Sequence, residues 1–162
     1  METFLFWAAL AGLGLLLVCT AYSDLTERRI PNAVTLAIAV LAVPYWLGRG
    51  MTMAELGAQA LFAAVAVGVL LLIWQAGFWL KKRLMGGGDV KLLAALALWL
   101  PASPYIEMLF WMALAGLGVT LLAVAENRWR GRAAPTRVPY GVAIVIGVLA
   151  VHGELIVNEF PA

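Results

Sequence analysis

The chain has 162 residues, of which 64% are hydrophobic and 12% charged, and its mean hydropathy is +0.95. Soluble domains are closer to half apolar and a quarter charged, so this composition excludes an ordinary soluble protein and indicates that lipid surrounds most of the surface. The single cysteine, Cys19, excludes a disulfide framework and a zinc site with several cysteine ligands. The net charge of +2 is uninformative by itself, and no nucleic-acid partner is expected.

Six apolar runs are candidate membrane spans, because about 20 helical residues cross a hydrocarbon core of roughly 30 Å. The first begins close to Glu2, and the lack of a basic segment before it argues against a cleaved secretory signal. After this run, Pro31 and Asn32 are typical of a helix start. We therefore predict an all-α membrane protein of about six transmembrane helices, one domain over 1–162 and no soluble domain. The expected spans are 4–22, 33–47, 56–80, 89–100, 105–125 and 138–157.

Lysine and arginine concentrate in alternate loops, and short cytoplasmic loops are enriched in these residues. An external N-terminus leaves only Arg49, of the eleven basic residues, outside the cell. This orientation places Asp24, just beyond the first span, and Asp89, at the start of the fourth, on the cytoplasmic face.

Residues 86–91 read Gly-Gly-Gly-Asp-Val-Lys and separate the third and fourth apolar runs. A carboxylate where a membrane helix begins is costly, which makes Asp89 a functional candidate. The span 89–100 covers only about 18 Å. Either the segment after it dips inward or Asp89 lies below the membrane interface, and Gly86 to Gly88 suit a close-packed, non-helical entry to a cavity there.

Simpler interpretations stand beside these. An aspartate after a glycine-rich loop is often only the N-cap of the next helix, which would account for Asp89. Asp24 in a polar turn is often only solvated. Lys91, Arg28 and Arg29 are most simply determinants of membrane orientation.

Two carboxylates at one water can work as a base and an acid, because repulsion between them separates their pKa values. The base activates water for attack on a peptide carbonyl, and the acid protonates the leaving nitrogen, with no metal or cofactor. The sequence does not favour other catalytic mechanisms. The only histidine, His152, is expected outside and at the surface, away from Ser23. The chain also has no HExxH motif and no Walker loop.

Taken together, these residues resemble the type IV prepilin peptidases, the GxGD class of aspartic membrane proteases. Asp24 followed by Ile30-Pro31-Asn32 is similar to the family's first-aspartate segment. Residues 86–92 are similar to its GxGDxKL segment, and residues 138–143 to the Pro-Tyr-Gly segment that opens its last helix. The resemblance extends over nearly the whole chain in order.

The resemblance implies that Asp24 and Asp89 are catalytic, and it is carried over to no other residue. We expect Gly86, Gly88 and Lys91 to belong to the loop that supports the catalytic site. The resemblance also implies a multi-pass protein of the bacterial inner membrane that removes the basic leader from pilin-like, type IV or Flp precursors at the cytoplasmic face. Besides the precursor and the lipid bilayer, pilus or secretion assembly components are candidate partners. Lacking paired CxxC motifs, the chain is similar to the short form without an N-methyltransferase domain, as in Tad/Flp pilus systems.

Other functions remain open. A presenilin-like intramembrane protease would carry Tyr-Asp where this chain has Ser23-Asp24, and it would have more spans. A small proton or cation transporter could use the two carboxylates, although such proteins tend to place them near the midplane and to show repeated halves. A purely structural membrane subunit is the third alternative.

Overall fold

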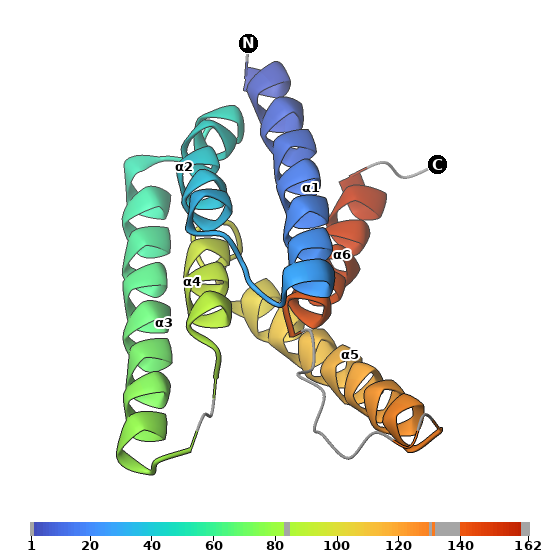
Figure 1. Ribbon diagram of the computed structural model, residues 1–162. Helices are drawn as coiled ribbons and strands as arrows, with labels where there is room; N and C mark the ends of the chain where they lie inside the picture. The colour runs from blue at the N-terminus through green and yellow to red at the C-terminus, as the bar shows by residue number, and fades with distance from the viewer. Residues whose placement is uncertain (1, 83–84, 130, 132–139, 160–162) are drawn as a thin grey trace.

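The computed structural model describes residues 2–82, 85–129, 131 and 140–159. Within these residues all regular secondary structure is α-helical, which confirms the predicted fold class. Figure 1 shows α1 and α2 side by side, α4 between α3 and the rest of the molecule, and α5 leaving at a steep angle. The helices are α1 (Glu2–Glu27), α2 (Asn32–Gly48), α3 (Met53–Trp79), α4 (Gly87–Leu96), α5 (Ala102–Trp129) and α6 (Tyr140–Glu159).

Three of the described helices are long and apolar enough to cross a membrane, namely Thr3–Glu27, Met53–Trp79 and Ala102–Trp129. Two more, Asn32–Gly48 and Tyr140–Gly153, are apolar but shorter. Large apolar side chains stay exposed along the long helices, for example on the outer faces of α3 and α5. Water would disfavour such surfaces and lipid would not, so the chain is an all-α membrane protein.

The short helix α4 is the most buried element. It packs on α2, α3 and α6, and its Leu92, Leu93 and Leu96 side chains are at most 1% exposed. The expected span 89–100 is wrong in extent, because the helix ends at Leu96 and its ten residues cover only about 15 Å. In Figure 1 the first turn of α4 lies beside the middle of α3.

Side chains from neighbouring helices satisfy the carbonyl groups that follow α4. Gln59 of α3 donates to the carbonyl oxygens of Ala97 at 2.8 Å and Leu100 at 3.0 Å, and Trp46 of α2 donates to that of Leu98 at 2.8 Å. A helix end leaves carbonyls without partners, which is costly where water is absent. These donors explain why the helix can end inside the protein.

Two helix starts show what local sequence can specify. The predicted start at Pro31 and Asn32 is confirmed, with Pro31 as the N-cap of α2. Helix α3 begins three residues before the expected 56, because the Thr52 hydroxyl accepts the Glu55 N–H and the Glu55 carboxylate accepts the Thr52 N–H. This Thr-x-x-Glu capping box is a signal that the sequence carried.

Two residues lie in other surroundings than predicted. Helix α1 continues through the polar residues to Glu27, so Asp24 belongs to the end of a helix and not to a loop beyond it. His152 is only 7% exposed, so its expected position at the surface is wrong. It is nevertheless about 16 Å along α6 from Gly141, the α6 residue that contacts Asp24, and therefore remote from Ser23.

Candidate active site

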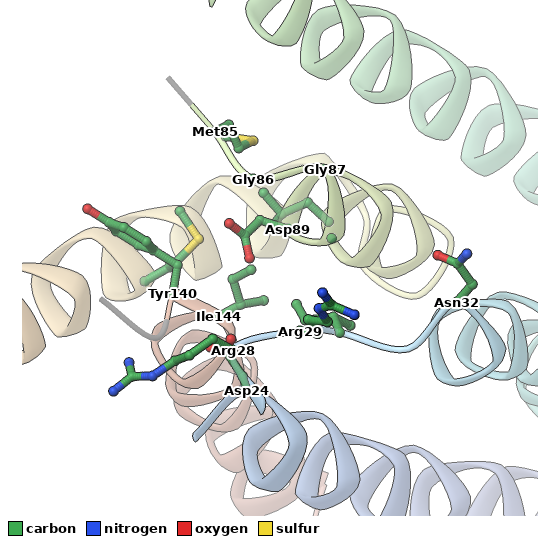
Figure 2. A pocket seen from close by; sticks show the side chains of 14 residues that line it. Asp24, Arg28, Arg29, Asn32, Met85, Gly86, Gly87, Asp89, Tyr140 and Ile144 are labelled. Atoms are coloured by element: carbon green, nitrogen blue, oxygen red, sulfur yellow. The ribbon is translucent and has the colours of Figure 1, made fainter. Parts of the chain in front are cut away.

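Asp24 and Asp89 line the same cavity, which has a volume of about 680 Å³. Figure 2 shows the two side chains approaching this space from opposite sides, Asp24 from the end of α1 and Asp89 from the first turn of α4. The structure therefore brings the two predicted acids together. The other lining residues are Arg28, Arg29, Ile30, Asn32, Met85, Gly86, Gly87, Gly88, Leu93, Met112, Tyr140 and Ile144.

Asp24 is buried, with 7% of its surface exposed. Its Oδ2 atom accepts a hydrogen bond of 2.7 Å from the backbone N–H of Gly141, at the start of α6. The two residues are 117 positions apart in the chain, so the contact depends on the packing of α1 against α6. The simple interpretation of Asp24 as a solvated loop residue is wrong.

Asp89 is the third residue of α4, and the N-cap position belongs to Gly86. The Asp89 carboxylate lies close to Gly86 and lines the cavity. Helix α4 is not among the helices long enough to span the membrane. Partial burial, and after it the negative charge of Asp24, raise the pKa of Asp89 to about 6, against the lowering effect of the Gly86 N–H.

The first and third glycines of the motif lie in tight surroundings, whereas the middle one does not. A Cβ atom at Gly86 would lie 2.7 Å from the Asp89 Oδ2 atom, and one at Gly88 would lie 3.2 Å from the Ile30 Cβ. At Gly87 nothing is within 4 Å of such an atom. Gly86 is the N-cap of α4 and Gly88 lies in its first turn, so the expected non-helical conformation is wrong for Gly87 and Gly88. A side chain at Gly86 or Gly88 would meet a different neighbour in each case.

Lys91 does not line the cavity. Its Nζ atom donates a hydrogen bond of 2.9 Å to the Oδ1 atom of Asn32. This bond links the segment after Asp89 to the first residue of α2. Lys91 therefore connects α4 to the start of α2, in addition to the expected effect of its charge on membrane orientation.

Arg28 and Arg29 follow the end of α1 and line the cavity with exposed side chains. Arg28 has a backbone φ of 55°, the left-handed conformation that commonly turns the chain after a helix. In Figure 2 the Arg28 side chain extends away from Asp89. The turn at Arg28 directs the following Ile30 toward Gly88.

Sequence reasoning assigned no role to three residues at the site: Gly141, which binds Asp24 without lining the cavity, and the lining residues Met112 and Ile144. Gly141 had a signal, because it belongs to the Pro-Tyr-Gly segment, of which Val138 and Pro139 lie outside the described residues. Met112 and Ile144 had none, since single apolar residues inside apolar runs cannot be told from lipid-facing ones. In the part of the chain that the structure describes, no three His, Cys, Asp or Glu side chains cluster as metal ligands would.

Sequence comparisons show which known proteins the chain is similar to. The chain matches the type IV leader peptidase family over residues 6–121, which include both acids. It is 32% identical over 158 residues to the prepilin leader peptidase/N-methyltransferase of Pectobacterium carotovorum subsp. carotovorum, covering 95% of this chain and 52% of that protein. It is 37% identical over 137 residues to the protein of the same name from Burkholderia pseudomallei strain 1026b, covering 77% and 40%.

The chain thus spans about half the length, or less, of these curated relatives. No solved structure matches it. The family match covers well over half of the chain, and it contains the two segments whose aspartates meet at the cavity. On this basis the chain belongs to the type IV leader peptidase family.

Proposed function

We propose that the chain is a membrane-embedded aspartic endopeptidase that removes the basic leader from pilin-like type IV or Flp precursors at the cytoplasmic face of the bacterial inner membrane. The observation that carries the proposal is the meeting of Asp24 and Asp89, 65 residues apart in sequence, at one cavity. The names of the relatives, prepilin leader peptidase/N-methyltransferase, support the substrate class. The proposal covers peptide cleavage and not methyl transfer.

In the proposed reaction a water molecule lies between the two carboxyl groups. The Asp24 carboxylate accepts a proton from the water as the water oxygen attacks the carbonyl carbon of the scissile peptide bond. Asp89, whose raised pKa favours the protonated form, donates a proton to the leaving nitrogen as the C–N bond breaks. The products are a leader with a new carboxylate and a mature protein with a new amino terminus.

The cytoplasmic siting is supported by the distribution of basic residues. Single cysteines in a Cys19→Ala background test it, because the chain has no other cysteine. Lys82→Cys, beyond the end of α3, should react with a membrane-impermeant thiol reagent only after the cells are permeabilised. Met53→Cys, at the start of α3, should react in intact cells. The opposite pattern would place the acids outside.

A co-expression assay tests the activity itself. A pilin-like precursor from the same genome is expressed with wild type, Asp24→Asn or Asp89→Asn, and cleavage is followed by gel shift. Glu27→Gln is the matched control, because Glu27 is an exposed acid on the same helix as Asp24. We expect cleavage by wild type and by Glu27→Gln only, with all four proteins inserted in the membrane.

The outcomes separate the candidate functions. Cleavage by either aspartate variant would refute the paired mechanism. If no protein cleaves the precursor, proton flux through vesicles that contain wild type or Asp89→Asn would decide for or against a transporter. Flux that Asp89→Asn abolishes would replace the peptidase with a transporter that uses the same two carboxylates.

A further inference from the structure

We propose that Gly141 is a positioning residue for Asp24: the start of α6 fixes the Asp24 carboxylate in the cavity, and only a glycine allows α6 to approach so closely. The inference rests on the proposed function, because it concerns the geometry of one of the two proposed catalytic acids. It gives α6, whose Tyr140 and Ile144 line the cavity, a role in placing one of the two acids.

The first line of support is the hydrogen bond. The Gly141 N–H donates to Asp24 Oδ2 over 2.7 Å, and the Asp24 residue is 93% buried with its helix packed directly on α6. The first N–H groups of a helix have no partner within the helix, so they are available to a carboxylate. A single oxygen bound in this way fixes the rotation of the carboxyl group about its bond to Cβ.

The second line of support is the lack of space. A Cβ atom at Gly141 would lie 2.8 Å from Asp24 Oδ2, 3.0 Å from its Cγ and 3.1 Å from its Cβ. The crowding involves the base of the Asp24 side chain as well as its tip. Rotation of the carboxylate alone would therefore not relieve it, and a larger residue at position 141 would move either the whole side chain or the two helices.

The other two glycines of α6 provide controls within the same helix. A Cβ atom at Gly147 would lie 2.6 Å from the carbonyl oxygen of Met108 and 3.0 Å from the Met112 nitrogen, so Gly147 serves the packing of α6 against α5. At Gly153 nothing is within 4 Å. The three glycines therefore differ in what an added methyl group would meet, namely a proposed catalytic carboxylate, a neighbouring backbone or open space.

The experiment compares Gly141→Ala, Gly147→Ala and Gly153→Ala with wild type and Asp24→Asn in purified form. It measures kcat and KM for a pilin-like precursor, together with thermal unfolding in the same detergent. We expect Gly141→Ala to lower kcat by roughly 100-fold with little change in KM, because a small misplacement of a reacting group has a cost of this order. Gly147→Ala should lower the unfolding temperature while the folded enzyme keeps its kcat, and Gly153→Ala should match wild type.

Two results would overturn the inference alone, provided that wild type cleaves and Asp24→Asn does not. One is a kcat of Gly141→Ala equal to that of wild type. The other is a loss of activity in Gly141→Ala that only follows the loss of folded protein, as expected for Gly147→Ala. Failure of wild type to cleave the precursor would instead overturn the proposed function, and this inference with it.

Discussion

Gly88 and Ile30 lie so close together that a Cβ atom on the glycine would be 3.2 Å from the Cβ of the isoleucine. Farther along the same two segments, Lys91 donates to Asn32. The segment around the second acid therefore packs on the segment after the first acid at two points. These contacts give the two motifs a shared physical role, since each segment holds the other at the edge of the cavity.

The glycine segment should tolerate substitution only in the middle. Gly86→Ala should reduce the rate of precursor cleavage by roughly 100-fold, because its Cβ would displace the Asp89 carboxylate. Gly88→Ala should reduce it less, since its contact is with Ile30 and not with an acid. Gly87→Ala is the matched control and should cleave like wild type. Equal activity of all three variants in a cleavage assay would contradict this account of the motif.

The hydrogen bond between Lys91 and Asn32 should contribute modestly to the cleavage rate, and the two residues should act through this one bond. Lys91→Gln and Asn32→Ala should each lower activity less than about tenfold, and the double variant should lose little more than either single one, because both remove the same exposed hydrogen bond. Lys82→Gln, an exposed lysine with no place at the cavity, controls for the loss of positive charge. Effects that simply add in a double-mutant cycle would show that the two residues act separately.

The cleavage rate should depend on pH through the proton that Asp89 donates. Asp89 must hold a proton to donate it, and its pKa is about 6, so the rate should fall as the pH rises above this region and Asp89 ionises. Initial rates in a series of buffers of constant ionic strength test this. Glu27→Gln is the control, and its pH–rate profile should match that of wild type. A rate that rises continuously into alkaline pH is the contrary result.

The end of α4 should depend on Gln59. Gln59→Leu leaves the carbonyl groups of Ala97 and Leu100 without their donor, at a cost of about 1–3 kcal/mol for each buried acceptor. The unfolding temperature in detergent should therefore fall. Gln75→Leu is the matched control, because Gln75 is exposed on the same helix. Equal unfolding temperatures for the two variants would show that the Gln59 bonds contribute nothing to stability.

Sequence alone predicted the helical class and most of the apolar helices, and it drew attention to the two acids that line one cavity. Lipid leaves few stable structures for an apolar run, so hydropathy is enough to indicate helices. A carboxylate in such a chain is costly, so Asp24 and Asp89 could be recognised before any contact was known. The start of α2 was likewise readable from Pro31 and Asn32, because helix starts depend on local backbone chemistry.

Tertiary structure decided what surrounds those residues. Hydropathy reports whether a side chain avoids water, but it does not report which neighbour replaces the water. The burial of His152, the end of α4 at Leu96 and the bond from Gly141 to Asp24 were therefore not readable from local patterns. Each depends on the packing of helices that are distant in sequence, and that packing also makes one cavity from two separate acids.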